Sequence, residues 1–212
     1  MSEPVLVIGA GGHAKVLVEA LLAEGALIAG VVDADATLLG QSVLGVPVVG
    51  DDRVIEDFPC DAVRLVNGIG SIGVPVLRRT IFERLSGRGY RFAVVVHPSA
   101  VVASDVDLPD GVQVMAGAVL QPGCRIGSNV IINTRASVDH DCTVGDHTHI
   151  APGVTLSGGV TIGAGCHVGT GATVIQEVRI GDGSVIGAGA VVTKDVAAGV
   201  TVVGVPAKVV VR

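Results

Sequence analysis

A six-residue repeat runs through the second half of the chain and limits what it can fold into more than any other feature. From Val102 to Val192, every sixth residue is Val, Ile or Leu, at sixteen positions without a break in register. The residue four positions further on is usually small or β-branched, as in Ala118, Cys124 and Ala136. A fixed period of this length indicates a repeat architecture and is interpreted before any local propensity.

The period predicts a parallel β-helix with three flat sides. Six residues make one short strand and one corner, so three units close a triangular coil of eighteen residues, and coils stack at strand spacing, about 4.8 Å. The aliphatic side chain points into the prism and the small residue fits beside it, while Gly or a polar residue takes the corner. No single unit buries its apolar face, so stability comes from stacking. A sandwich of short strands, the alternative, would need turns at varied spacing. The left hand of the helix departs from the usual crossover preference and is taken from the resemblance to known hexapeptide proteins.

The first part of the chain has a different pattern. Apolar strands are predicted over 4–10, 27–32, 46–49, 62–66 and 91–96, with helices over about 16–25 and 74–85. Alternating strands and helices predict a small, Rossmann-like parallel sheet wrapped by helices. We therefore expect an α/β domain over 1–97 and an all-β left-handed parallel β-helix over 98–212, with the tail after Val192 acting as its cap.

Composition excludes several classes of function. The net charge of −6 gives no basic footprint for nucleic acid, and aromatic residues make up only 2% of the chain, too few for a base-stacking platform. No apolar run approaches the length of a membrane span, and the chain begins with a strand rather than a signal sequence, so we expect a cytoplasmic protein. Three of the four cysteines fall on the small inward position of the repeat, where a thiol acts as a compact apolar filler.

A glycine loop joins the first strand to the first helix. Gly9-Ala10-Gly11-Gly12-His13 would place backbone N–H groups at a helix start, where they favour a phosphate. Ala14 replaces the last Gly of the dinucleotide pattern, and Asp33 lies about twenty residues on, where its carboxylate can accept from a ribose hydroxyl. Fewer than 100 residues give barely one mononucleotide-binding half, so a nucleotide or nucleotide-sugar is favoured over NAD. A tight turn without a ligand is the alternative.

His140 stands out within the repeat. It follows the inward Val138 by two positions, so it should project near a corner, and Asp139 and Asp141 flank it. A carboxylate next to an imidazole favours one tautomer and raises its basicity, as a general base near neutral pH requires. A solvated histidine in a polar corner is an equally open interpretation.

A second histidine pattern points to a different chemistry. His149 and His167 are eighteen residues apart, one full coil, and should stack on the same edge. Stacked histidines raise the possibility of a zinc site of the carbonic anhydrase type, but such a site needs a third ligand. His147 lies on a differently directed position of the repeat, so no metal is expected.

The motifs together resemble one bacterial family. The order is GAGGHAKV after a strand, a second strand ending in Asp33, HPSA at 97–100, VDHD at 138–141, H-x-H-I-x-P-G at 147–153 and GVPAK at 204–208. This order is similar to the nucleotide-sugar N-acetyltransferases of bacillosamine and perosamine synthesis and to the sialic acid O-acetyltransferases. The resemblance covers nearly the whole chain.

The resemblance implies a homotrimer with acetyl-CoA in the groove between neighbouring prisms and the nucleotide-sugar on the N-terminal domain. It implies that His140 is the catalytic base and Asp141, where some relatives have Glu, its acidic partner. It further implies three groups of binding residues: Asn133 for the sugar; His149, Gly158 and Ala188 for the coenzyme, the last two through backbone amides; and Gly11, Gly12, His13, Asp33 and Asp35 for the nucleotide.

The sequence hypothesis is an acetyl-CoA-dependent N-acetyltransferase acting on the amine of a nucleotide-linked 4-amino-4,6-dideoxy sugar. Backbone N–H groups would stabilise the oxyanion, and no covalent acyl-enzyme is required. The rivals are O-acetylation of a sialic acid or related sugar, a zinc hydratase, and a non-catalytic trimeric scaffold. No residue distinguishes GDP from UDP; whole-chain similarity favours GDP-perosamine slightly.

Overall fold

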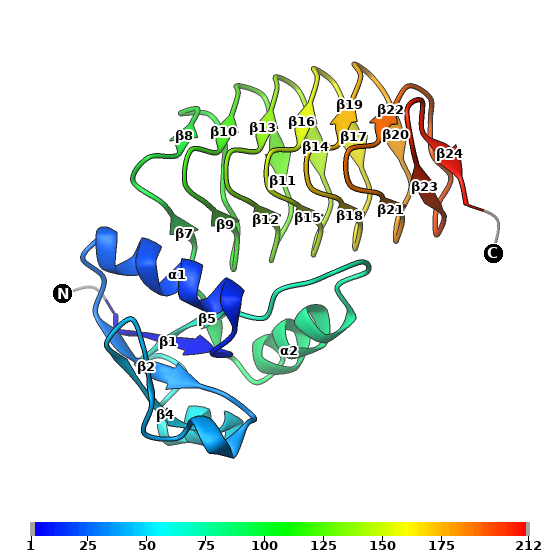
Figure 1. Ribbon diagram of the computed structural model, residues 1–212. Coiled ribbons are helices and arrows are strands. Elements are labelled where there is room, and N and C mark those ends of the chain that lie inside the picture. The colour runs from blue at the N-terminus through cyan, green and yellow to red at the C-terminus, as the bar shows by residue number, and fades with distance from the viewer. Residues whose placement is uncertain (1–2, 211–212) are drawn as a thin grey trace.

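The computed structural model describes residues 3–210 and contains two domains joined directly (Figure 1). The N-terminal domain holds a six-stranded sheet of order β3-β4-β2-β1-β5-β6, in which only the β3–β4 pair is antiparallel. Its elements are β1 (Val5–Ile8), α1 (Gly12–Ala23), β2 (Ile28–Val32), the 3-10 helix η1 (Ala36–Leu38), β3 (Ser42–Val43), β4 (Val46–Gly50), the 3-10 helix η2 (Asp52–Asp57), β5 (Arg64–Asn67), α2 (Val76–Ser86) and β6 (Arg91–Phe92).

The two faces of this sheet are covered by different elements. On one face, buried residues of α1 such as Leu17 and Leu21 pack on β1, β2 and β4, and this core also includes Met115 of the C-terminal domain. On the other face, Ile81 and Phe82 of α2 pack on β1, β5 and β6. Helix α1 therefore lies between the sheet and the second domain, so the loop that precedes it opens at the junction of the two domains (Figure 1).

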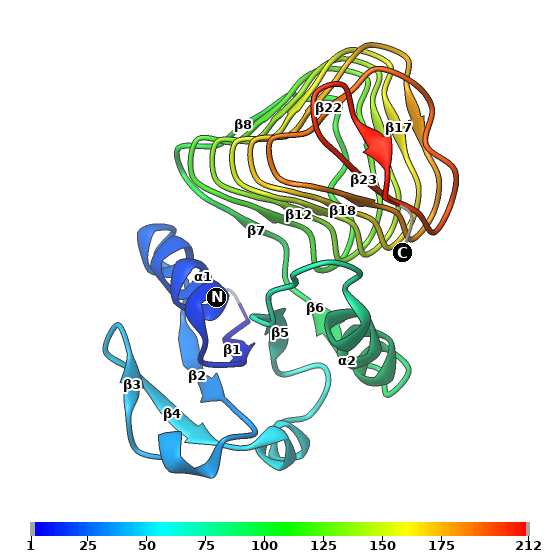
Figure 2. The ribbon, with the colours of Figure 1, turned by 45° about the vertical axis from the view of Figure 1, so that its right-hand side comes forward.

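The C-terminal domain is the expected three-sided prism, best seen in Figure 2. Almost all of its strands are two residues long and pair with strands eighteen residues away; for example, Ile131 pairs with His149. We name the three sides after their strands. The first face holds β8 (Val101–Val102), β10 (Val119–Leu120), β13 (Ser137–Val138), β16 (Thr155–Leu156), β19 (Thr173–Val174) and β22 (Val191–Val192). The second face holds β11 (Arg125–Ile126), β14 (Thr143–Val144), β17 (Thr161–Ile162) and β20 (Arg179–Ile180). The third face holds β7 (Val95–Val96), β9 (Gln113–Val114), β12 (Ile131–Ile132), β15 (His149–Ile150), β18 (His167–Val168), β21 (Val185–Ile186), β23 (Thr201–Val203) and β24 (Lys208–Val209).

The inward pattern of the repeat is confirmed by burial. From Val114 to Val192 every residue of the six-residue series is buried, and Ala118, Cys124 and Ala136 are buried beside it. The first two members, Val102 and Leu108, are only half-buried, and Leu108 forms no strand, because the second face begins one coil later, at β11. The sequence period therefore predicts the prism correctly, but it predicts one strand more than the prism has.

The prediction of a single strand over 91–96 is wrong, because the structure has two short strands there. Residues 91–92 form β6, which pairs with β5 in the first sheet, whereas 95–96 form β7, which pairs with β9 in the prism. Phe92 stacks on Phe82 on the α2 side of the sheet, with ring centroids 4.5 Å apart, whereas Val95 is buried on the α1 side. The change of pairing partner shows that the chain passes from the first sheet to the prism between these two residues. The domain boundary at 97/98 stays a prediction. Strand β7, just before it, already pairs with β9 of the prism.

The far end of the prism closes with a change of strand direction. β23 continues the third face in parallel with β21, and β24 then turns back and pairs with β23 antiparallel. In the part of the chain that the structure describes, no helix has the length and apolar character needed to cross a bilayer.

Candidate active site

A cavity of about 670 Å³ opens where the two domains meet. One wall is the glycine loop before α1, with Gly11, Gly12 and His13, and the opposite wall is the loop after β5, residues 68–72. Asn133 and His149 complete it from the third face of the prism. Five residues that the sequence assigned to the nucleotide or sugar therefore line one cavity, namely Gly11, Gly12, His13, Asp33 and Asn133.

The glycine loop leaves backbone donors free at this cavity. Gly11 is the extended N-cap of α1, and no side chain caps the helix. Asp33 holds the loop in place: its Oδ2 accepts from the Ala10 N–H at 2.6 Å and its Oδ1 from the Asp35 N–H at 2.9 Å. An uncapped helix N-terminus with no side chain at Gly12 is suited to an anion such as a diphosphate.

His13 is fixed in one tautomer. Its Nε2 lies 2.8 Å from Oε1 of Gln113, and Gln113 in turn donates from Nε2 to the Asn67 carbonyl at 2.8 Å. Since the amide oxygen can only accept, His13 donates from Nε2, and Nδ1 remains unprotonated. Burial and then the charge of Arg78 lower the pKa of His13 to about 4, so the ring is neutral at physiological pH.

His149 is the centre of a second hydrogen-bonded group. Asn133 Oδ1 accepts from the Thr134 N–H, so Asn133 Nδ2 donates to His149 Nε2 at 3.0 Å. His149 Nδ1 then carries the proton and donates to Ser71 Oγ at 2.9 Å, which leaves the Ser71 hydroxyl free to donate. Burial, followed by the charges of His167 and His13, lowers the pKa of His149 to about 3. The group is a neutral set of directional donors and acceptors.

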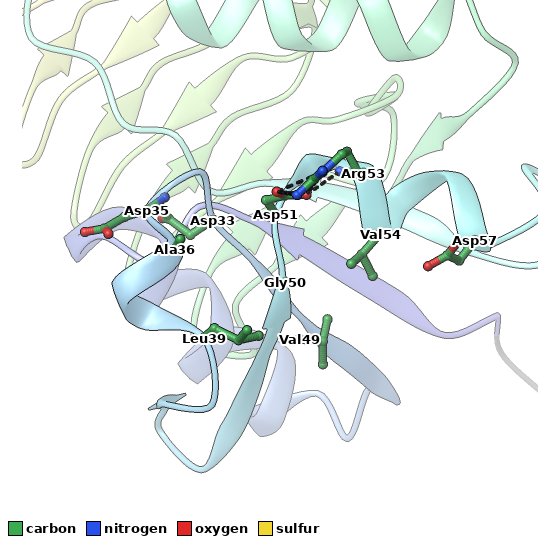
Figure 3. Close-up of a pocket in the computed structure, with 10 residues that line it drawn as sticks. All are labelled: Asp33, Asp35, Ala36, Leu39, Val49, Gly50, Asp51, Arg53, Val54 and Asp57. Atoms are coloured by element: carbon green, nitrogen blue, oxygen red, sulfur yellow. Dashed lines mark hydrogen bonds and ion pairs between the residues drawn. The ribbon is translucent and has the colours of Figure 1, made fainter.

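A second cavity, of about 480 Å³, lies on the other side of Asp33 (Figure 3). It opens at the carboxyl ends of β2 and β4, with Leu39 and Val49 on its apolar side. Asp51 and Arg53 form an ion pair at its rim. Asp35 lines this cavity and not the first one, so the predicted nucleotide residues divide into two adjoining spaces that share Asp33.

His140 lies at the corner between the first and second faces, as its sequence position predicts. Its Nδ1 is 2.8 Å from Asp141 Oδ2, and 63% of the His140 side chain is exposed. Because the carboxylate accepts, Nδ1 carries the proton and Nε2 is free to accept another. The hydrogen bond to Asp141, with a further contribution from Asp139, raises the pKa of His140. These are the properties of a general base.

The imidazole of His140 lies directly against Gly158 in the next coil. A Cβ placed on Gly158 would be 2.5 Å from His140 Nε2. The Gly159 N–H donates to the His140 carbonyl at 2.9 Å, whereas the Gly158 N–H has no partner among residues 3–210. Two residues that the sequence assigned to different roles, base and coenzyme contact, are thus in contact.

The two groups of site residues lie at different corners of one prism. His140, Asp141 and Gly158 are at the corner between the first and second faces, whereas Asn133 is at the corner between the third and first faces. Ala188 is exposed at this latter corner, three coils beyond Thr134. His149, expected in the coenzyme groove, lines the cavity that also holds His13, and its role in coenzyme binding stays a prediction.

The histidine stack is confirmed in geometry. His149 and His167 are paired in register, with ring centroids 5.0 Å apart and the rings edge to face. Both nitrogens of His149 are already hydrogen-bonded, and residues 3–210 contain no group of three side chains placed to hold a metal ion.

Sequence reasoning missed the polar side chains that organise the cavity from beneath, namely Ser71, Asn67, Gln113 and Arg78. The only local signal was the segment GIGSIG at 68–73, a second glycine-rich loop at the carboxyl end of a strand. Strand β5 is the immediate neighbour of β1, so the two loops face the same edge of the sheet. Gln113 is fully buried on a strand of the prism, and nothing in the six-residue period marks it.

Comparisons with known proteins agree with this architecture. The PglD N-terminal domain family matches residues 4–85, and the bacterial transferase hexapeptide family (six repeats) matches 123–158 and 159–194. The search of curated proteins gave no match. These two matches and the prism define a hexapeptide-repeat acyltransferase.

Solved structures narrow the class further. A variant of GDP-perosamine N-acetyltransferase from Caulobacter crescentus, in complex with CoA and GDP-perosamine, is 42% identical with a TM-score of 0.91, covering 98% of this chain and 97% of that one. The acetyltransferase domain of PglB from Neisseria gonorrhoeae FA1090, in complex with acetyl coenzyme A, is 38% identical with a TM-score of 0.91, covering 99% and 100%. WeeI from Acinetobacter baumannii AYE is 26% identical with a TM-score of 0.64, covering 97% and 99%. The chain belongs to the family of acetyltransferases that join a PglD-type N-terminal domain to a hexapeptide prism.

Proposed function

We propose that the protein transfers the acetyl group of acetyl-CoA to the 4-amino group of a nucleotide-linked 4-amino-4,6-dideoxy sugar, with GDP-perosamine the favoured acceptor. The observation that carries this proposal is the pairing, in one chain, of a cavity of about 670 Å³ on the glycine loop with the His140–Asp141 base on the prism. The relative from Caulobacter crescentus, which has both domains, carries CoA and GDP-perosamine in its complex.

The chemistry follows from the free nitrogen of His140. The lone pair of the sugar amine attacks the thioester carbonyl carbon, and His140 Nε2 takes a proton from the amine while Asp141 stabilises the imidazolium through Nδ1–H. The C–S bond then breaks, and the thiolate of CoA takes up the proton from His140. The unpartnered Gly158 N–H is placed beside His140 to donate to the oxyanion, a contribution that is commonly large.

The two adjoining cavities suggest how the nucleotide-sugar lies. The diphosphate is at the free N-terminus of α1, and the ribose is at Asp33, where the two cavities meet. The base then enters the cavity of Figure 3, and the sugar extends toward Asn133 at the prism. In this pose the reacting amine lies at the corner between the third and first faces.

This pose requires a second copy of the chain. His140 lies at a different corner of the same prism, so the base must come from a neighbouring prism packed side by side. Closed cyclic packing makes three such sites in a homotrimer, with acetyl-CoA in the groove between prisms, where Gly158 and Ala188 would meet it. We place the enzyme in the cytoplasm, where acetyl-CoA is available.

The substrate assignment is tested by acetyl transfer. Purified protein is given acetyl-CoA with GDP-perosamine, a UDP-linked 4-amino sugar or a sialic acid, and thiol release and product mass are measured. We expect N-acetylation of a nucleotide-linked amine and a 10²- to 10⁴-fold lower kcat in His140→Ala with coenzyme binding kept. Acetylation of the sialic acid hydroxyl alone, or unchanged turnover of His140→Ala, would contradict the proposal.

The shared site is tested by mixing two inactive variants. Gly12→Phe should block the cavity without disturbing the fold, because a Cβ at Gly12 has nothing within 4 Å. After subunit exchange with His140→Ala, about one quarter of the sites in randomly mixed trimers combine an open cavity with an intact base. Activity should return to roughly that level. Exchange without any return of activity would show that each chain supplies its own base.

A further inference from the structure

Arg78 is the one fully buried charged side chain that no ion pair accounts for among residues 3–210. It lies on α2 beneath the cavity, is 1% exposed, and appears in no salt bridge with a carboxylate. Its Nη1 donates to the carbonyls of Asn67 at 2.6 Å and Ile69 at 3.1 Å, while Nε and Nη2 have no partner. Burying a guanidinium without a counter-charge is costly, and such a group calls for an explanation.

The hydrogen bonds of Arg78 act on the wall of the cavity. They hold two carbonyls in the interior, that of Asn67 at the end of β5 and that of Ile69 in the loop that follows. In a trans peptide the C=O and N–H point in opposite directions, so an inward Ile69 carbonyl turns the Gly70 N–H outward. Gly70 lines the cavity, and neither its N–H nor that of Ser71 has a partner in the described chain.

The loop has little freedom to take another course. A Cβ on Gly68 would lie 2.6 Å from the Ile8 carbonyl oxygen, and one on Gly70 would lie 3.3 Å from Cβ of His13. The Asn67 side chain also ties this loop to α2, since its Nδ2 donates to the Arg78 carbonyl at 3.0 Å. The guanidinium therefore holds a tightly packed loop through the Ile69 carbonyl.

The charge of Arg78 also reaches the cavity. It contributes to the lowered pKa values of two rings that line the cavity, His13 from the start of α1 and His149 from the prism, and both rings are neutral. Burial lowers the pKa of Arg78 itself only to about 9, so the guanidinium remains charged at neutral pH. The cavity thus lies next to an unpaired positive charge, and a diphosphate would supply the missing negative charge.

We infer that Arg78 is a positioning residue for the nucleotide-sugar: it turns the Gly70 amide toward the diphosphate or the sugar and provides a buried counter-charge to the bound anion. This inference rests on the proposed function for the identity of the ligand. It adds a second set of backbone donors, opposite the N-terminus of α1, to the same site.

The test compares two variants. Arg78→Met keeps a side chain of similar volume but removes the positive charge and the hydrogen-bond donors. Arg78→Lys keeps the positive charge but loses the planar set of guanidinium donors. Calorimetric Kd values are measured for GDP, UDP and CoA, and KM values for acetyl-CoA and the amino sugar. Loss of a charged hydrogen-bond donor predicts a roughly 10- to 100-fold weaker Kd for the nucleotide and a matching rise in its KM. The Kd for CoA, the KM for acetyl-CoA and kcat at saturation should stay within about 3-fold. Arg78→Lys should recover part of the loss, and the salt dependence of nucleotide binding should be weaker in Arg78→Met.

Arg79→Met is the matched control. Arg79 is the next residue of α2, is exposed and pairs with Glu83, so its loss should leave nucleotide binding unchanged. Unchanged nucleotide affinity in Arg78→Met overturns the inference, as does an equal loss of CoA and nucleotide binding, which indicates a purely structural role. If Arg78→Met fails to fold, Arg78→Lys is used instead: weaker nucleotide binding with unchanged CoA binding supports the inference, and any other result overturns it. GDP and UDP binding is measured without acetyl transfer, so a wrong acceptor assignment leaves this test intact.

Discussion

Gly158→Ala should damage catalysis through a single added methyl group. The new Cβ would be 2.5 Å from Nε2, 2.6 Å from Cε1 and 3.2 Å from Cδ2 of His140. Ordinary van der Waals contact begins at 3.4 Å, so the ring must move by 3.4 minus 2.5, or 0.9 Å. A displacement of about 1 Å in a reacting group can cost on the order of 10²-fold in rate, so we expect kcat to fall by about that factor.

The backbone itself should tolerate the change. Gly158 does not have a left-handed φ, and Gln176 occupies the same corner position one coil further on. The melting temperature of Gly158→Ala should therefore stay close to that of the unaltered protein. Gln176→Ala, measured in parallel, serves as the control for this corner.

The assay is thiol release at saturating substrates, with KM for acetyl-CoA determined separately. A double-mutant cycle with His140→Ala separates the two possible routes. If Gly158→Ala acts by moving the ring, it should cost almost nothing in the His140→Ala background. A full 10²-fold loss in that background, or a rise confined to the KM for acetyl-CoA, would refute the reasoning and assign Gly158 to the coenzyme alone.

Three further perturbations test other parts of the structure. Asp141→Asn removes the carboxylate that raises the pKa of His140. Since the unprotonated ring is the base, the acid limb of the kcat/KM profile should move to lower pH, and the plateau should fall roughly 10-fold or more. An acid limb that stays at the same pH in a pH-rate profile would contradict this. Asn suits the left-handed φ of +60° at position 141, so circular dichroism should show no loss of fold. Gly68→Ala places a Cβ 2.8 Å from Cβ of Ala14 and should push α1 off the sheet, weakening GDP binding in calorimetry more than CoA binding. Leu156→Ala should cost about 2–5 kcal/mol of unfolding free energy in urea, because Leu156 is fully buried in the prism, and a cost below ~1 kcal/mol would show that neighbouring coils close the gap.

The sequence predicts the prism so well because its signal is repeated and local. Each coil needs the same inward aliphatic residue, so Val114 and Val192 obey one rule although nearly 80 residues separate them. The strand expected over 91–96 failed for the opposite reason. Its apolar run is continuous, and only the strand pairing reveals that the chain changes domain there: residues 91–92 pair with β5 in the first sheet, whereas 95–96 pair with β9 in the prism.

The residues of the candidate site likewise fall into those that local sequence predicts and those that only the folded structure brings together. His140 with Asp141 are neighbours in sequence, so their contact and the exposed corner could be predicted from spacing. Arg78, Ser71 and Gln113 come from three segments that meet only in the folded domain junction. A buried arginine also has no distinctive pattern on a helix, because its sequence context is the same as that of an exposed one.

The hairpin at the end of the prism changes what the third face offers to another molecule. A parallel sheet that stopped at β23 would present a ready edge to which another molecule could add its own strands, and stacking of this kind leads to fibres. β24 reverses direction and pairs antiparallel with β23. A strand from another molecule would therefore meet β24 rather than a parallel strand of the repeat. The reversal therefore disfavours end-to-end addition of a second prism on the third face, and it leaves the flanks of the column as the surfaces on which the proposed site between two copies would form.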